Sequence, residues 1–162
     1  MDIAKLVTDI NQTLAAHSLW DGYWILSFKR KTLSIGASFD RSRGRLYDIV
    51  FKQVDFFNLP AQWRDTDTFE HDLLRLSTVE EFSRHHADLV PEGSHVFAID
   101  LMYPRGALLC KLTHFVVAPK LYFFRTQPPH DQYGAGGYVD PLASEAQPCL
   151  INRVTQSKWR RT

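Results

Sequence analysis

The chain has 162 residues, of which 44% are hydrophobic and 23% are charged, and its formal net charge is +1. This length suits one domain that buries a sizeable core. The near-zero net charge argues against a bulk binder of polyanions and against an acidic mimic. Cys110 and Cys149 lack the spacing of metal ligands, and free thiols in a reducing cytosol suit a chain of this size.

The N-terminal residues show an amphipathic pattern where a secretory signal would have a basic start and an apolar run. No apolar stretch of the sequence reaches the length needed to span a bilayer. We therefore expect a cytoplasmic protein that stays out of the membrane.

Apolar residues at helical spacing predict an N-terminal helix. They are Ile3, Leu6, Val7, Ile10 and Leu14. Asp2, which comes just before them, is a suitable N-cap. We expect the single apolar stripe of this helix to pack on a sheet.

Three strands are predicted in the next segment, at residues 23–29, 32–39 and 45–57. The second shows the cleanest alternation of the chain. Its apolar face carries Leu33, Ile35, Ala37 and Phe39. The opposite face, expected to be wet, carries Thr32, Ser34, Gly36 and Ser38. The third strand changes parity after Phe51, which predicts a bulge or bend near Lys52 and Gln53.

The middle of the chain is predicted to hold a further strand, a short helix and a three-stranded meander. The strand covers residues 68–76, and a capping box from Thr78 to Glu81 begins the helix, with Val79 and Phe82 facing inward. The meander covers residues 95–103, 107–117 and 120–126, with a tight turn at 103–106 and a break at Pro119. Both faces of its first strand are apolar, so we expect central strands that are covered on both sides.

The grouping of strands into hairpins, without alternating helices, predicts an α+β fold. We expect a mostly antiparallel sheet of about six or seven strands, with an N-terminal amphipathic helix and one short inserted helix. Residues 1–127 form a single α+β domain in this interpretation. Residues 128–162, rich in proline and glycine, form a C-terminal extension that docks on the same domain.

Charge is unevenly distributed along the chain. Residues 29–52 hold seven lysines and arginines and two aspartates, an excess of five positive charges, whereas residues 53–101 hold ten acidic residues and three arginines. A basic hairpin of this kind could bind carboxylates of a protein partner, because arginine recognises them in a bidentate manner. It could also bind single-stranded nucleic acid, with a nearby aromatic ring stacked on a base. The simpler interpretation is that these charges only keep the two ends of the hairpin solvated.

A second candidate is the acidic run at residues 65–72. Asp65, Asp67, Glu70 and His71 could bind a hard cation or supply an acid and a base. The run lacks the glycine and the terminal glutamate of a calcium-binding loop. We therefore favour aspartates that cap a turn.

The histidines are a third candidate. His85 and His86 are expected at the end of the short helix, and His95 and His114 on neighbouring strands of the meander. A zinc set of His95, His114 and Asp100 can be imagined, but no spacing requires it. We favour histidines with ordinary hydrogen-bond partners, and we expect neither a metal site nor a cofactor.

Large aromatic side chains in predicted loops and in the C-terminal extension are a further signal. They are Trp20, Trp63, Tyr133, Tyr138 and Trp159. Rings placed outside a core are typical of interface anchors.

The sequence contains no nucleophile elbow, phosphate-binding loop or dinucleotide fingerprint. We therefore expect a non-catalytic domain that binds another protein, such as a small bacterial inhibitor or immunity-type protein, and not an enzyme. The expected partner-binding residues are Arg30, Arg41, Arg43, Arg45, Trp63, Tyr133, Tyr138 and Trp159. The alternatives are a single-stranded nucleic-acid binder that uses the basic hairpin and a metal-dependent enzyme centred on the acidic run.

Overall fold

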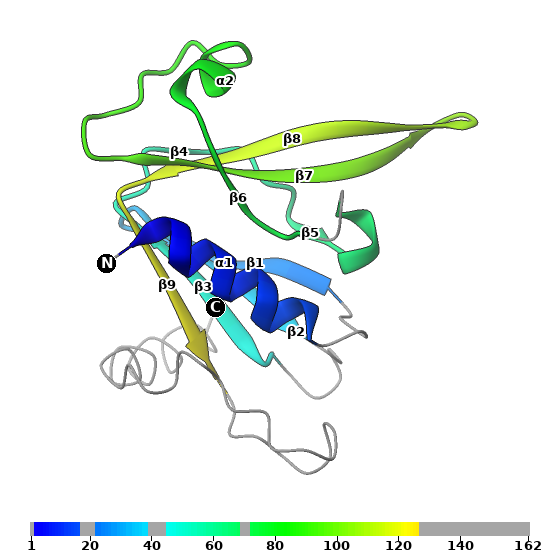
Figure 1. Cartoon of the computed structure of the whole chain (residues 1–162), viewed down its shortest axis with the longest axis horizontal. Coiled ribbons are helices and arrows are strands. Elements are labelled where there is room, and N and C mark those ends of the chain that lie inside the picture. The colour runs from blue at the N-terminus through cyan, green and yellow to red at the C-terminus, as the bar shows by residue number, and fades with distance from the viewer. Residues whose placement is uncertain (1, 17–21, 39–44, 69–71, 127–162) are drawn as a thin grey trace.

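The computed structural model describes residues 2–16, 22–38, 45–68 and 72–126. Within these residues it holds two α-helices, one 3₁₀ helix and nine strands in two antiparallel sheets (Figure 1). In chain order the elements are α1 (Ile3–Ala15), β1 (Gly22–Lys29), β2 (Thr32–Ser38), β3 (Tyr47–Lys52), β4 (Phe56–Phe57), β5 (Gln62–Trp63), the 3₁₀ helix η2 (Asp65–Asp67), β6 (Arg75–Ser77), α2 (Val79–Ser83), β7 (His95–Arg105), β8 (Leu108–Ala118) and β9 (Lys120–Arg125).

The strand order is β5-β1-β2-β3-β9 in the five-stranded sheet and β4-β8-β7-β6 in the four-stranded sheet. The predicted α+β fold, with mostly antiparallel strands and two α-helices, is confirmed. The strand number exceeds the expected six or seven for two reasons. The strand predicted at residues 45–57 divides into β3 and β4, and β5 has only two residues, too few to show a period of two. The strand predicted at residues 68–76 is reduced to β6. Neither helix of the described part of the chain is long and apolar enough to cross a membrane.

The N-terminal helix forms as its sequence predicts. The Asp2 side chain accepts hydrogen bonds from the backbone amides of Ala4 and Lys5 and caps the first turn. The apolar stripe of α1 is buried in the main core, which also contains side chains from both sheets. The side chain of Asn11 bonds to both backbone groups of Leu74, at 2.6 and 3.1 Å, and so ties the helix to the segment that leads into β6.

The first hairpin joins β1 and β2 through a two-residue turn. Arg30 and Lys31 both have positive φ, 49° and 58°, which matches the twist of the flanking strands. The expectation of a wet face on β2 is wrong, because Ser34 and Ser38 are fully buried. A Cβ on Gly36 would lie 3.2 Å from the side chains of Trp24 and Leu26 on β1, so large neighbouring side chains cover this face.

The chain passes between the two sheets four times, and two of these passages occur where the sequence predicts a bend or a break. The bend predicted near Gln53 is present, with a φ of 57° at that residue, and it carries the chain from β3 in one sheet to β4 in the other. The break at Pro119 returns it, because β9 pairs with β3 and not with β8 as a simple meander would require. The main core lies between the sheets, where the rings of Phe51 and Phe97 meet edge to face at 5.1 Å.

The long hairpin of β7 and β8 turns at Gly106 and Ala107, not at residues 103–106 as expected. Gly106 has a φ of 61°, which a two-residue hairpin turn with glycine in its first central position requires. Pro104 lies inside β7, opposite Leu109. The glycine therefore decides the position of the turn, and the proline is accommodated in the strand.

The outer part of this hairpin, residues 102–112, is called the arm below. On the body side, β6 pairs with Val96–Ala98 and β4 with Val116 and Val117, and there β7 is buried on both faces as expected. The arm extends beyond these neighbours as a two-stranded ribbon (Figure 1). Leu108, Leu109 and Leu112 are exposed there by 71%, 68% and 53%, so the expectation of cover on both faces fails for the arm.

The short helix α2 begins at the predicted capping box, since Thr78 accepts a hydrogen bond from the Glu81 amide at 3.1 Å. Phe82 is fully buried as expected, but Val79 is 48% exposed, so its predicted inward direction is wrong. Phe82 packs against Phe56 and Phe115 at 5.1 and 5.5 Å. This second apolar cluster fixes α2 on the four-stranded sheet.

Candidate ligand-binding pocket

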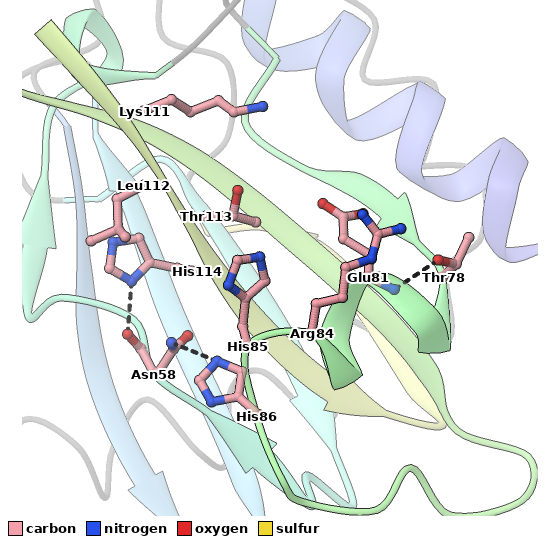
Figure 2. Close-up of a pocket in the computed structure, with 10 residues that line it drawn as sticks. All are labelled: Asn58, Thr78, Glu81, Arg84, His85, His86, Lys111, Leu112, Thr113 and His114. Carbon is pink, nitrogen blue, oxygen red and sulfur yellow. Dashed lines mark hydrogen bonds between the residues drawn. The ribbon is translucent and has the colours of Figure 1, made fainter.

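A pocket of about 590 Å³ lies between the end of α2 and the outer half of β8 (Figure 2). The side of the helix supplies Thr78, Glu81, Arg84, His85 and His86. The side of the strand supplies Lys111, Leu112, Thr113 and His114, and Asn58 after β4 completes the lining. Its volume falls in the range of pockets that bind small ligands or side chains of a partner.

The C-terminal end of α2 and the residues just after it place Arg84, His85 and His86 at the pocket. The backbone amides of His85 and His86 both donate to the Phe82 carbonyl at 3.0 Å, so the anchoring of Phe82 also fixes these residues. Arg84 and His85 are exposed, and Figure 2 shows His85 projecting toward Thr113 of β8. The pocket wall is therefore built on a fixed backbone with solvent-facing basic side chains.

His86 is held more firmly than His85. Its ring stacks on Phe82 at 5.1 Å and packs on Phe56 at 4.6 Å. Its Nε2 lies 3.4 Å from the Asn58 amide nitrogen. An amide nitrogen only donates, so Nε2 accepts and Nδ1 carries the ring proton. His86 thus offers an N–H donor, whereas His85 makes a tilted contact with Phe115 at 5.9 Å.

His114 is nearly buried, with 8% exposure. Its Nδ1 donates to the Asn58 carbonyl at 2.8 Å, because a carbonyl only accepts. In the neutral ring, Nε2 then accepts from the Tyr103 hydroxyl at 2.9 Å. Burial, and then the charge of Asp67, raise the pKa of Tyr103, which keeps the hydroxyl protonated. Both ring nitrogens of His114 are occupied by the fold.

Asn58 connects the strands to the helix at the base of the pocket. Its side-chain Oδ1 accepts from the backbone amide of Phe115 at 2.7 Å, and its backbone amide donates to the Phe115 carbonyl at 3.2 Å. The side chain therefore continues the pairing of β4 with β8 by one residue, and its Nδ2 faces His86. This arrangement fixes which way the amide points, because Oδ1 is already used by β8.

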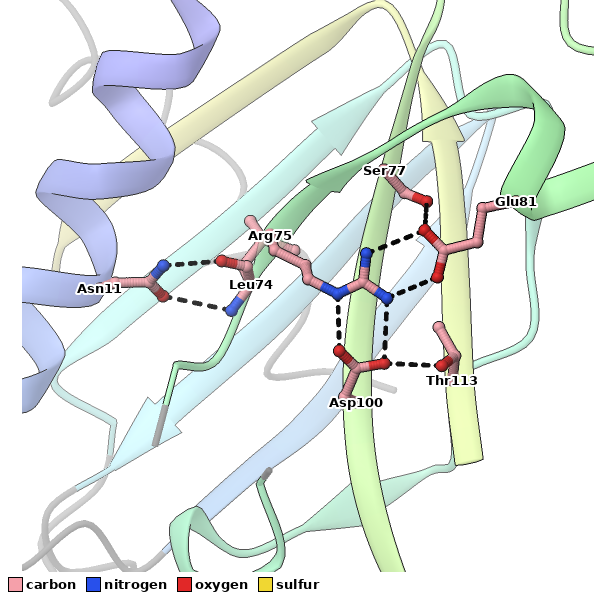
Figure 3. Close-up of polar contacts among 7 residues, drawn as sticks. All are labelled: Asn11, Leu74, Arg75, Ser77, Glu81, Asp100 and Thr113. Atoms are coloured by element: carbon pink, nitrogen blue, oxygen red, sulfur yellow. Dashed lines mark hydrogen bonds and ion pairs between the residues drawn. The ribbon is translucent and has the colours of Figure 1, made fainter. Parts of the chain in front are cut away.

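Glu81, the acidic residue of the pocket lining, is held by Arg75 (Figure 3). Arg75 donates to both oxygens of Glu81, at 2.9 and 2.6 Å, and to both oxygens of Asp100, at 2.6 and 3.2 Å. Ser77 also donates to Glu81, and Thr113 donates to Asp100 at 2.6 Å. This network joins β6, β7, β8 and α2.

The pKa values of the two carboxyl groups reflect this network. The hydrogen bonds from Arg75 lower the pKa of Glu81 to about 2. Burial acts to raise the pKa of Asp100, but the bonds from Arg75 and Thr113 outweigh it and leave that pKa below its ordinary value. Both groups are ionised at neutral pH. With Glu81 held by Arg75, the pocket lining is left with Arg84 and Lys111 as its other full charges.

The two described arginines of the predicted basic hairpin lie apart. Arg30 is exposed at the turn before β2, and Arg45 lies beyond the opposite end of that strand. Arg45 is 15% exposed and its Nε donates to Asp48 at 2.6 Å. The seven-residue strand β2 therefore separates Arg30 from Arg45. Arg41 and Arg43 lie outside the described residues.

The predicted exposure of Trp63 is wrong. Its ring is 4% exposed and stacks on Tyr23 at 5.6 Å. The pairing of β5 with β1 brings it into the main core. The other predicted contact aromatics, Tyr133, Tyr138 and Trp159, lie outside the described residues, as does Trp20.

The acidic run has a local structural role where it is described. Asp67 accepts a hydrogen bond from the Arg64 amide at 3.0 Å and closes the turn of η2, as the capping interpretation predicts. Glu70 and His71 lie outside the described residues. No group of three or more metal-ligating side chains occurs among the residues that the structure does describe.

The imagined zinc set does not assemble either. His114 lies opposite Ile99 in the β7–β8 ladder, while His95 lies opposite Ala118. Asp100 faces Arg75, on the face of the sheet opposite to His114, because neighbouring strand positions alternate.

Sequence reasoning found the histidine pair but missed its neighbours. Arg84 and Lys111 are distant in the chain, and only the passage of β8 beside the end of α2 brings them to one pocket. The apolar pattern of β8 predicts a covered strand, whereas the leucines of the arm are exposed. The run Leu108-Leu109 interrupts the alternation of a half-buried strand, and this is the one local signal that could have shown their exposure.

Comparisons of the chain with protein-family models, with curated proteins and with solved structures gave no match.

Proposed function

We propose that the protein is a non-catalytic protein-binding domain that contacts its partner through the arm and the pocket beside it. The observation that carries this proposal is the exposure of Leu108, Leu109 and Leu112 on a ribbon that extends from the body. Leu112 also lines the pocket, so the apolar surface and the basic pocket are continuous.

The arm offers apolar side chains on both of its faces. Leu108 and Leu112 lie on one face and Leu109 lies on the other, because side chains alternate along β8. An isolated two-stranded hairpin is marginally stable in water. Burial of each exposed leucine by a partner would contribute about 1.5–3 kcal/mol, enough to stabilise both the arm and the complex.

The charge of this surface indicates the chemistry of the partner. Residues 101–114 contain Arg105 and Lys111 and no aspartate or glutamate. Arg84 and His85 add basic groups from the end of α2. The complementary surface is therefore apolar at its centre and carries carboxylates around it.

The hydrogen bonds of the polar groups in the pocket support a binding function over a catalytic one. Both ring nitrogens of His114 and both oxygens of Glu81 already have partners within the fold. Groups held in this way fix the shape of a surface.

The test is a comparison of three forms of the full-length protein in capture from an extract of the source cells. The double variant Leu108→Ser, Leu112→Ser should capture at least about tenfold less of one protein that the wild type retains. Leu89→Ser is the matched control, because Leu89 is 90% exposed away from the arm. Equal recovery with all three forms would refute the proposal.

A finer form of the proposal is a small bacterial inhibitor or immunity-type protein, whose arm enters the active site of its partner. A protruding ribbon suits a concave target. The captured protein would then be an enzyme that the wild type inhibits and that the Leu108→Ser, Leu112→Ser variant leaves active. An unaffected activity would reject this form and leave binding itself intact.

A single-stranded nucleic-acid binder is the second candidate, and one observation favours it. Lys52 and Lys120 lie directly opposite each other on β3 and β9, at the end of the sheet where β1 ends at Lys29 and the turn to β2 carries Arg30. This candidate predicts binding of mixed-sequence oligonucleotides at low salt, with a steep loss as salt is added. A flat anisotropy titration with labelled oligonucleotides would dispose of it.

A further inference from the structure

We infer that the pocket beside the arm is a subsite for a carboxylate of the partner, and that it binds this carboxylate more tightly in mild acid. The inference rests on the proposed function, since it names the group that the partner places there. It depends on Arg84, His85 and His86, which follow one another at the end of α2.

Arg84 supplies the permanent charge. Its side chain is exposed at the pocket, and no ion pair joins it to a carboxylate of the described residues. Glu81, the acidic group of the lining, is held through both oxygens by Arg75 and also by Ser77. An incoming carboxylate can therefore form a charge-assisted pair with Arg84 without displacing an existing one.

His86 forms a fixed part of the pocket wall. Its ring packs on Phe82 and Phe56, and its Nε2 lies 3.4 Å from the Asn58 amide nitrogen. Asn58 cannot turn this amide, because its Oδ1 is used by the Phe115 amide at 2.7 Å. The position of the His86 ring is therefore set by the fold.

His85 supplies the dependence on pH. It is exposed, and its contact with Phe115 involves the ring face, so either ring nitrogen can take a proton. Histidine gains its charge between about pH 8 and pH 5. The charged and titratable groups that line the pocket with it are Arg84 and Glu81 from the side of the helix, His86 next to it, and Lys111 and His114 on β8. A bound carboxylate next to His85 would favour the charged ring.

The size of the pH effect follows from one added charge. A unit charge about 4 Å from a carboxylate in water strengthens binding about fivefold. Lys111 on β8 also lines the pocket, but its charge already acts on Glu81 and Asp100, so the inference does not depend on it.

The experiment uses the full-length protein and two synthetic peptides. One is a short segment of leucine and glutamate, and the other carries glutamine in place of every glutamate. Binding is followed by the NMR signals of the His85 and His86 rings, at about pH 5.5 and about pH 7.5. We expect the acidic peptide to shift both rings and to bind about fivefold more tightly at the lower pH.

Two variants separate the roles of the residues. Arg84→Gln should weaken binding of the acidic peptide at both pH values. His85→Gln should remove most of the pH effect and leave the affinity at the higher pH unchanged. Lys120→Gln is the control, since Lys120 is an exposed lysine on β9, outside the pocket. Equal binding of the two peptides, no shift of either ring, or an equal loss with Lys120→Gln would overturn the inference.

The result is distinguishable from failure of the proposed function. A partner that depends on Leu108 and Leu112 but not on Arg84 would sustain the arm as a docking surface and reject the carboxylate subsite. Occupation of the pocket by a second copy would appear as a concentration-dependent dimer that Arg84→Gln dissociates, and it would also reject the inference.

Discussion

Burial of Asp48 should make the protein less stable at neutral pH than in mild acid. The side chain is 1% exposed on β3, and its Oδ1 accepts from Arg45 at 2.6 Å. Its Oδ2 has no hydrogen-bond partner among the described residues. Burial raises the pKa of Asp48 from its ordinary value of 3.8 to about 6, although the charge and the hydrogen bond of Arg45 act to lower it.

The sign follows from the protons bound in each state. Between pH 4 and pH 6 the folded protein keeps a proton on Asp48 that the unfolded chain has released. The free energy of unfolding therefore falls as pH rises through this window. The difference between the two pKa values corresponds to about 3 kcal/mol, a large part of the 5–15 kcal/mol that is typical of a folded domain.

Glu81 and Asp100 make the free energy of unfolding change with pH in the opposite direction. Their pKa values are lowered in the folded state, so the stability they contribute is lost as pH falls below the ordinary range of carboxyl groups. We therefore expect the free energy of unfolding to be greatest near pH 4 to 5, between these two effects.

The assay is urea denaturation followed by circular dichroism across this pH range. Asp48→Asn should remove the fall between pH 4 and pH 6, because the variant has no proton to release. Asp88→Asn is the control, since Asp88 is exposed and its replacement should leave the fall in place. If the wild type keeps a constant or rising stability through this window, Arg45 outweighs burial and the reasoning is wrong.

Two further substitutions test the parts of the fold that build the pocket and a third tests the packing on β2, each by the free energy of unfolding in urea. Phe82→Ala should cost about 3–5 kcal/mol, because the ring is fully buried beneath α2; a cost below about 1 kcal/mol would show that α2 is not anchored there. Arg75→Gln should cost about 2 kcal/mol at neutral pH, since it leaves Asp100 without its main partner, and the deficit should shrink toward pH 2 as the carboxyl groups take up protons. Gly36→Ala should cost about 1–3 kcal/mol, because its Cβ would press on Trp24 at 3.2 Å; no loss would mean that this ring moves freely.

The elements that the sequence predicts well are those determined by neighbours along the chain. The periodicity and the cap of α1, the capping box of α2 and the Arg30–Lys31 turn are all local patterns. They form as predicted because each is stabilised by contacts within a few residues.

The elements that the sequence misses depend on distant partners. β5 has two residues, and only its pairing with β1 makes it a strand and buries Trp63. The same reason explains the separation of Arg30 from Arg45, since counting charges along the chain ignores the length of β2 between them. The sequence does not predict the pocket, because His85 and His86 are adjacent in sequence but Lys111 reaches them only through the fold.

The repeated passage of the chain between the sheets has a consequence for synthesis on the ribosome. The outer edge of β3 receives its partner only from β9, the last of the described strands to be made. Until then the growing chain carries an uncovered strand edge next to a half-formed core, a state in which pairing with other chains is a hazard. Completion of the five-stranded sheet is thus delayed until nearly the whole described part of the protein has been translated.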